Sequence, residues 1–321
     1  MKEFIITKND AGQRVDKFIT KSVPLLPKSL MYKYIRLKRI KLNGKKTDIA
    51  VRLCENDVLQ LYINDEFFEK TDEKYSFLKA GKSLDIIYED ENVMLLDKKV
   101  GLLSHPDETE YVDTLITRVQ RYLYEKGEYD PKNEAYFAPA LVNRIDRNTG
   151  GIVIAAKNAA SLRILNEKLK NREIKKFYLC VLIGKPPKKS DTITAYAVKD
   201  EKKNKVTVFD NPVPGGKTMV TKYNVIKSEN GLSLAEVDLL TGRTHQIRAH
   251  LAHIGTPLLG DGKYGTNELN ARFGGYKKQF LYSYKTVFDF VTDAEELNYL
   301  KGKSFEVKDV WFKEKFSEIT E

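Results

Sequence analysis

Short apolar runs separated by tight turns recur along most of this chain. Residues 84–90 and 93–98 form two such runs, and Asp90-Glu91-Asn92 between them is typical of a hairpin turn. Further runs follow at 151–157, 175–184, 218–226, 232–239 and 280–284. Helical patterns are fewer, at 114–124, 160–170 and within 241–255. Because strands joined by short turns pair antiparallel, we expect an α+β fold with a mixed, largely antiparallel central sheet.

The N-terminal segment has a different pattern, which predicts a small α+β unit. A helical pattern begins at Arg14 and is broken by the prolines of the segment Val23-Pro24-Leu25-Leu26-Pro27. Ser29 is expected to cap a second helix. Two short strand-like runs follow, at 40–43 and 58–63, and Asn43-Gly44-Lys45 is a strong turn signal between them.

A change in composition suggests where this unit ends. Residues 64–80 are polar and mixed in charge, so we interpret them as a linker. The aromatic side chains within the linker predict that it docks against the rest of the protein. The chain is therefore expected to comprise a small domain at 1–63, the linker, and a second domain at 81–321.

The charge balance favours a polyanionic partner. Lys and Arg number 55 against 45 Asp and Glu, which gives a formal net charge of +10. Nucleic acid is the first candidate, although a merely basic protein has a similar composition. No run approaches the roughly 20 apolar residues that span a bilayer, so no membrane partner is expected. The start of the chain lacks a signal-peptide pattern, and Cys54 and Cys180 are expected to be reduced core residues of a cytoplasmic protein.

The stretch 142–151 is the strongest candidate for chemistry. It places Asp146 between Arg144 and Arg147, in a loop that ends in Thr149-Gly150-Gly151 and enters an apolar run. A carboxylate on a loop held by a buried strand suits a reactive site, and flanking arginines favour its ionised form. A salt-bridged structural loop is the alternative for a lone Asp of this kind.

Three histidines within 241–255 suggest a metal site, but their spacing argues against one. His245 and His250 are five residues apart, which on a helix separates their directions by about 140°. No cysteine is near in the sequence, and the HExxH spacing is absent. We therefore predict that the protein uses no metal.

The N-terminal pattern resembles the small RNA-binding domain first described in a ribosomal protein of the small subunit. The matching stretches are Arg14-Val15-Asp16-Lys17, the basic helix after Ser29, Lys41-Leu42-Asn43-Gly44-Lys45 and Asn56-Asp57-Val58. In that family the basic helix and the following turn hold the RNA backbone, which positions RNA without determining its sequence. The resemblance implies RNA contacts at Arg36, Lys38, Arg39 and Lys45.

Nearly the whole chain resembles the pseudouridine synthases that modify large-subunit ribosomal RNA, and their tRNA-modifying relatives. Several long motifs occur in the family's order. They are Leu102-Leu103-Ser104-His105-Pro106, 143–151, Lys176-Phe177-Tyr178, and 241–250 with Gly260-Asp261. The resemblance implies an isomerase that breaks the glycosidic bond of a uridine, rotates the uracil and rejoins it through a ring carbon. Because no group is gained or lost, no cofactor is required.

The resemblance also implies roles for single residues. Asp146 is the catalytic carboxylate, with two roles open to it: attack on the anomeric carbon, or removal of a proton from the neighbouring sugar carbon. Arg248 is expected to pair with it through a bidentate fork. Tyr178 is expected to lie against the uracil ring. Arg144 is expected to fill the gap left by the flipped base.

Further basic residues are expected to contact RNA and to take no part in the chemistry. They are Arg147, Lys176 and Arg243. The chain departs from the family pattern at three positions. The family usually has His where Asn143 stands, Ser where Gly150 stands, and His where Tyr282 stands.

We expect the substrate to be large-subunit ribosomal RNA or an assembly intermediate of that subunit, bound by a monomer. A tRNA pseudouridine synthase and a non-catalytic RNA-binding or ribosome-assembly protein of the same fold are the alternatives. A glycosidase would require a second cooperating carboxylate, which the motif lacks. The sequence leaves open which uridine is modified.

Overall fold

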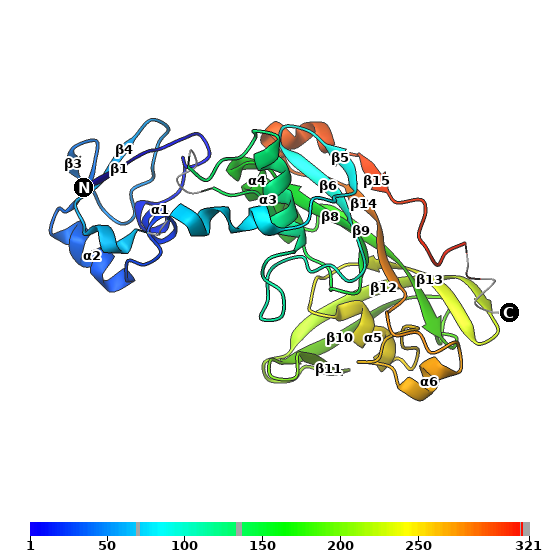
Figure 1. Cartoon of the computed structure of the whole chain (residues 1–321). Coiled ribbons are helices and arrows are strands. Elements are labelled where there is room, and N and C mark those ends of the chain that lie inside the picture. Colours follow the sequence, from blue (N-terminus) through cyan, green and yellow to red (C-terminus); the bar gives the residue numbers. More distant parts are fainter. Residues whose placement is uncertain (69–70, 133–136, 315, 317–321) are drawn as a thin grey trace.

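The computed structural model describes residues 1–68, 71–132, 137–314 and 316. Figure 1 shows a small sheet with two helices at one end of the molecule and a much larger sheet at the other. A short helical segment, coloured cyan, runs between them.

The small unit contains a sheet with the strand order β1-β4-β2-β3. Its elements are β1 (Lys2–Ile5), α1 (Val15–Ser22), α2 (Lys28–Arg36), β2 (Ile40–Leu42), β3 (Lys45–Lys46) and β4 (Val58–Leu61). Phe18 and Ile19 of α1 and Ile35 of α2 pack into a cluster whose buried members all lie within residues 6–63, and Phe67 and Phe68 pack against it. The turn Asn43-Gly44 joins β2 to β3, both residues having positive φ.

The prediction that Ser29 caps the second helix was wrong. The helix begins at Lys28, directly after Pro27, and no side chain bonds its first backbone N–H groups. Pro27 has φ −58°, and the proline ring holds that value without help from a capping side chain.

The large sheet has eleven strands. Its main path runs β11-β10-β12-β13-β9-β14-β8-β6-β5, with β7 beside β8 and β15 beside β14. The strands are β5 (Ile86–Glu89), β6 (Val93–Lys98), β7 (Ala140–Leu141), β8 (Gly150–Ala156), β9 (Ile174–Ile183), β10 (Ser190–Asp200), β11 (Lys205–Phe209), β12 (Lys217–Glu229), β13 (Leu232–Leu239), β14 (Leu281–Phe288) and β15 (Ser304–Glu306). The β8–β14 pair is parallel and the other described pairs are antiparallel, which confirms the predicted mixed, largely antiparallel sheet.

Helices border this sheet. They are α3 (Leu115–Glu125), α4 (Ala159–Lys170), α5 (Gln246–His253) and α6 (Asn267–Ala271). The structure also contains the 3-10 turns η1 (Asp65–Phe67), η2 (Thr71–Lys79) and η3 (Glu295–Leu300). The helix α5 occupies only part of the stretch 241–255 in which a helical pattern was predicted. His245 before it has φ 50°, a left-handed conformation that excludes it and the preceding turn from the helix.

Strand β9 separates two buried clusters because successive side chains of a strand point to opposite faces. Tyr178, Cys180 and Leu182 pack on one face, together with residues of α3 and α5. Leu179 and Val181 pack on the other face, against Phe280, Tyr282 and the C-terminal segment around Phe312. Side chains on the two faces of β9 therefore lie in separate clusters.

The segment predicted to be a linker carries η1 and η2 and is docked, as its aromatic residues suggested. Phe77 is buried, and its ring lies 5.7 Å from that of Tyr124 on α3. Tyr75 donates a hydrogen bond of 3.0 Å to Asp130. Residues 71–79 are therefore held against α3 through aromatic side chains.

Two further predictions concern the solvent exposure of particular residues. Cys180 is buried, but the prediction that Cys54 is a core residue was wrong, because Cys54 is exposed in the turn before β4. Its amide donates to Asp57 (2.7 Å), so that turn directs the side chain outward. Within the described residues, no helix has the length and apolar character needed to cross a membrane.

Candidate active site

Three elements bring the predicted catalytic residues together. Asp146 lies in the loop between β7 and β8, and Arg248 of α5 donates to it, with Nη1 2.8 Å from Oδ2. Tyr178, on β9, belongs to the same buried cluster as Ile145 and Ile247, the neighbours of those two residues in sequence. The loop that carries Asp146, helix α5 and strand β9 thus meet at one place.

The fork of Arg248 is not directed at Asp146 as predicted. Its Nε and Nη2 donate to the two oxygens of Asp261, at 2.6 and 3.0 Å, which leaves a single hydrogen bond for Asp146. Arg144 and Arg147, which flank Asp146, are exposed, and Arg248 is its ion-pair partner among the described residues. The physical reason is burial: Asp261 is only 1% exposed and requires the closer charge compensation.

The Arg248–Asp261 pair is held in its ionised form. Burial works to lower the pKa of Arg248, but Asp261 outweighs it and the pKa is raised. Burial works to raise the pKa of Asp261, but Arg248 outweighs it and the pKa is lowered. The amides of Lys263 and Tyr264 also donate to Asp261, so this carboxylate is saturated with hydrogen bonds. Arg248 therefore presents its third nitrogen to Asp146 from a fixed position.

The loop that carries Asp146 is anchored through its backbone. The buried Ser104 hydroxyl donates to the carbonyl of Ile145 (3.0 Å), and the amide of Gly101 donates to the carbonyl of Arg147 (2.8 Å). The amide of Thr149 donates to the carbonyl of Asp146 (3.0 Å). These bonds fix each peptide around Asp146, which is the preorganisation that a catalytic carboxylate requires.

Lys98, which the sequence did not single out, adds to this anchoring. It is fully buried, and its Nζ donates to the carbonyls of Lys99, Leu102 and Arg147 at 3.0, 2.7 and 3.1 Å. Burial lowers the pKa of Lys98 to about 7, and the charges of Asp146 and Asp97 oppose that shift. Only the ammonium form has the three N–H donors that the three carbonyls accept.

The departures from the family pattern have structural explanations. A Cβ added at Gly150 would lie 2.5 Å from the ring of Tyr282, so the large Tyr282 side chain requires glycine there. Gly151 has φ +109° and lies against the backbone of Ser283, where a Cβ would approach its carbonyl oxygen to 2.2 Å. Asn143 accepts a hydrogen bond of 2.9 Å from the amide of Ile154, which ties the loop to β8 without any charge.

Tyr178 is a neutral phenol in this site. Burial raises its pKa to about 12; a hydrogen bond with Ser283 lowers the pKa and the charge of Asp146 raises it. At neutral pH the residue therefore offers an aromatic face and an O–H group. It is suited to contact with a base and poorly suited to remove a proton in its resting state.

Tyr264, which lies against Arg248 and bonds His245, was not predicted from the sequence. The ring of Tyr264 lies 5.2 Å from the Arg248 guanidinium carbon, and its hydroxyl is 2.9 Å from Nδ1 of His245. Burial lowers the pKa of His245. The segment 260–265, which follows α5 as Gly-Asp-Gly-Lys-Tyr-Gly, was the available signal. The partners of its polar residues lie far enough away in the sequence that the sequence pattern alone did not identify them.

The other predicted contacts lie on two separate surfaces. Arg144, Arg147 and Arg243 are exposed around the candidate site, and Arg147 and Arg243 each donate from Nε to a backbone carbonyl. Lys176, on β9, is half-buried, and burial lowers its pKa. The remaining four residues are exposed on the small unit, at the end of α2 and beyond it: Arg36, Lys38, Arg39 and Lys45.

The three histidines have different partners. Among the described residues, no group of three potential metal ligands lies together. His250 is 1% exposed and bonds Thr221 through Nδ1 (2.9 Å), whereas His253 bonds Asp210 (2.7 Å). Burial lowers the pKa of His250 to about 4, and His253 adds to that effect.

We expect the stability of the fold to depend on His250 in acid. Below pH 6.5 the unfolded chain binds a proton at this residue and the folded chain does not, so stability falls as pH decreases towards about 4. The expected loss is about 3 kcal/mol. Urea unfolding at pH 7.5, 5.5 and 4.5 should show a smaller loss for His250→Gln than for the original protein. The partly exposed His253→Gln serves as the control, and equal pH dependence in all three proteins would contradict the expectation.

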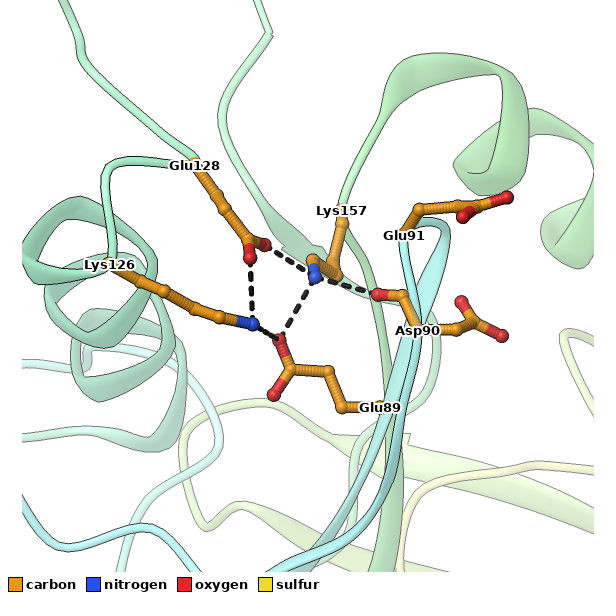
Figure 2. Close-up of a pocket in the computed structure, with 6 residues that line it drawn as sticks. All are labelled: Glu89, Asp90, Glu91, Lys126, Glu128 and Lys157. Carbon is orange, nitrogen blue, oxygen red and sulfur yellow. Dashed lines mark hydrogen bonds and ion pairs between the residues drawn. The ribbon is translucent and has the colours of Figure 1, made fainter.

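A hollow between the β5–β6 hairpin and the end of α3 differs from the candidate active site in its charge (Figure 2). Lys157 lies between Glu89 and Glu128 and also donates to the carbonyl of Asp90, while Lys126 pairs with the same two glutamates. The lining carboxylates, which include Glu91, outnumber the lysines. This is a stabilising ion-pair network whose net negative charge does not suit a polyanion.

Comparison with known proteins gives consistent matches. Residues 92–253 match the family model described as RNA pseudouridylate synthase. An uncharacterised RNA pseudouridine synthase of Mycoplasma genitalium is 34% identical, over 89% of this chain and 88% of that protein. Ribosomal large subunit pseudouridine synthase C of Rickettsia bellii is 32% identical, over 83% and 87%, and that of Vibrio parahaemolyticus is 29% identical, over 90% and 89%.

Solved structures support the fold. Human RNA pseudouridylate synthase domain containing 1 superimposes with a TM-score of 0.52 at 20% identity, over 66% of this chain and 81% of that one. Human RNA pseudouridylate synthase domain containing 4 gives 0.54 at 18% identity, over 70% and 88%.

Proposed function

This chain belongs to the RNA pseudouridylate synthase family, and we propose that it converts specific uridines of large-subunit ribosomal RNA to pseudouridine with Asp146 as the catalytic carboxylate. The hydrogen bond of 2.8 Å from Arg248 to Asp146 is the observation that carries this proposal. It places a fixed guanidinium beside the carboxylate of the loop 142–149. The names of the Rickettsia and Vibrio relatives support the choice of ribosomal RNA.

We assign the other residues by the chemistry that their positions allow. Arg248 orients Asp146, and Asp261 in turn holds Arg248, so Asp261 is a positioning residue. Tyr178 lies against the uracil as a neutral aromatic group. Arg144 takes the place of the flipped base, while Arg147, Lys176 and Arg243 bind phosphate. All of these groups come from one chain, so the proposed site is complete in a monomer.

The reaction is balanced within the substrate. The bond between the uracil nitrogen and the sugar breaks, a carbon–carbon bond to the same sugar forms, and the ring exchanges a proton on carbon for one on nitrogen. Asp146 has two possible roles: it can form a transient bond to the sugar carbon or take a proton from the neighbouring one. In either role it must be ionised and fixed, and the anchored loop supplies the second condition.

Mapping pseudouridines in all cellular RNA, with and without the gene, tests the proposed substrate. We expect one or a few positions of large-subunit ribosomal RNA to lose the modification, and these to regain it on incubation with purified protein. Loss confined to tRNA would replace the proposed substrate. No change in any RNA would contradict an enzymatic role.

We also propose that residues 1–63 form an RNA-binding domain that the segment 64–80 connects to a catalytic domain at 81–321. Its four exposed basic residues should bind phosphates. Replacing Arg36, Arg39 and Lys45 with Ser, and Lys38 with Asn because φ is 60° there, should raise KM for RNA by roughly tenfold or more. The slope of log affinity against log salt should fall by about 0.7–0.9 for each phosphate that the variant no longer binds.

A variant with the same loss of charge elsewhere provides the control for this prediction. Lys170, Lys185, Lys189 and Lys301 are exposed on the large unit, and their replacement by Ser should leave the salt slope nearly unchanged. The single-turnover rate at saturating RNA should be preserved in both variants. An equal salt slope in the two would show that the small unit does not bind the RNA backbone.

A further inference from the structure

A hollow lies on the sheet face opposite Tyr178, close behind the loop of Asp146. Its volume is about 740 Å³, which is within the roughly 300–1,000 Å³ typical of small-molecule sites. Phe280 and Tyr282 on its wall belong to the buried cluster on the far side of β9 from Tyr178. The hollow is therefore separate from the candidate active site.

Exposed aromatic rings line this hollow. Trp311 is 41% exposed and Tyr276 is 38% exposed, and the two lie together in this hollow. Both rest on the buried Phe280, with ring centroids 4.5 and 4.8 Å away. A fixed ring with one free face is a platform on which a planar group can stack.

Lysines outnumber carboxylates in the lining of the hollow, by three to two. Two carboxylates line it, but Asp85 pairs with Lys99 at 3.1 Å and Asp97 accepts a hydrogen bond of 2.6 Å from Tyr282. Lys277 and Lys278 are exposed at its edge and form no ion pair with the described residues. Their charge is available to an anionic ligand.

Both walls of the hollow also hold the loop that carries Asp146. Gln279, between Lys278 and Phe280, donates from Nε2 to the Thr149 hydroxyl at 2.9 Å. Lys99 and Val100 also line the hollow, and the next residue, Gly101, donates to the carbonyl of Arg147. RNA bound in the hollow would thus contact segments that are hydrogen-bonded directly to the loop of Asp146, the proposed site of uridine isomerisation.

We propose that this hollow binds an unpaired nucleotide of the substrate RNA, with its base stacked on Trp311 and Tyr276 and its phosphate between Lys277 and Lys278. Stacking on rings suits a base of any sequence, and two lysines suit a phosphate backbone. The proposal rests on the RNA-modifying function above. It adds a contact at a distance from the flipped uridine, which would select RNA with a single-stranded segment beside the target.

Trp311 is the one tryptophan of the chain, so its fluorescence reports on this hollow directly. The full protein is titrated with a single-stranded 12-residue oligoadenylate, which contains no uridine and cannot be turned over. We expect saturable quenching of the emission. Adenosine monophosphate should quench only at much higher concentrations, because a mononucleotide lacks the neighbouring phosphates.

Variants of the lysines and of Trp311 separate the contribution of charge to RNA binding from that of base stacking. Lys277→Ser with Lys278→Ser, both on the surface, should weaken oligoadenylate binding by roughly tenfold, whereas Lys185→Ser with Lys189→Ser should not. Trp311→Ala should weaken binding of an end-labelled substrate RNA, measured by anisotropy, by roughly tenfold. In the Lys277/Lys278 and Trp311 variants, KM for RNA should rise while the single-turnover rate at saturation stays unchanged; in the Lys185/Lys189 control both should stay unchanged.

The absence of quenching with the oligomer, or equal affinity in the Lys277 and Lys185 variants, would overturn this proposal. Quenching by the mononucleotide at concentrations as low as the oligomer would replace RNA by a free nucleotide as the ligand. These readouts are independent of catalysis. If the original protein forms no pseudouridine in any RNA but its fluorescence is still quenched, the proposed function is wrong. The hollow then remains an RNA-binding site.

Discussion

Asp146→Asn should abolish pseudouridine formation while RNA affinity stays within a few fold of the original. The side chain keeps its shape and can still meet Nη1 of Arg248, but an amide neither attacks a sugar carbon nor accepts a proton from one. We expect the single-turnover rate to fall by more than about a thousandfold, since nucleophilic or general-base catalysis is removed outright. The rate at saturating RNA measures this, and filter binding measures affinity.

A carboxylate change elsewhere controls for the removed charge. Asp200→Asn lies at the exposed end of β10 and should leave both rate and affinity unchanged. A near-normal rate in Asp146→Asn would remove this residue from the chemistry. A large loss of affinity with a normal rate on bound RNA would assign it to binding instead.

Removing Arg248 should affect both stability and rate. Arg248→Ala leaves Asp261 buried without a counter-charge, which typically costs about 3–5 kcal/mol of unfolding free energy. The rate should also fall by on the order of a hundredfold or more, because Asp146 loses the group that orients it. Arg248→Lys keeps one charge but cannot contact Asp261 and Asp146 together, so its rate should be almost as low while RNA affinity is maintained.

A double variant separates the two roles of Arg248. Arg248→Met with Asp261→Asn removes both buried charges, and denaturant unfolding should show most of the stability regained. The single-turnover rate should stay low, because nothing then contacts Asp146 from α5. Recovery of the rate together with the stability would show that Arg248 acts only on the fold. A loss of affinity alone would make it an RNA contact.

The sequence indicated the residues of the site better than their partners. Asp146, Tyr178 and Arg248 stand in motifs that are local in the chain, and the apolar runs around them predicted the strands that hold them. The fork of Arg248 was directed to the wrong carboxylate, because Asp261 follows thirteen residues later in a loop whose position depends on the whole fold. Burial decided that pairing, and burial is not a local property.

Local chemistry determined most of the architecture. Turn residues and the spacing of apolar side chains were sufficient to predict the largely antiparallel sheet and the break of α1 before Pro24. These features depend on neighbours a few residues apart. The parallel pairing of β8 with β14 had no local signal, because strands β9 to β13 lie between these two neighbours in the sequence.

Tertiary structure alone decided the environment of the buried polar groups. Lys98 resembles an ordinary lysine at the end of a strand, yet the fold surrounds its ammonium with three carbonyls, one of them from the loop that carries Asp146. Gly150 reads as a loose turn, yet its missing side chain makes room for Tyr282 from a strand far along the chain. The sequence determined which groups are present and which segments are strands. The packing of distant segments determined which of those groups lose water and must therefore find each other.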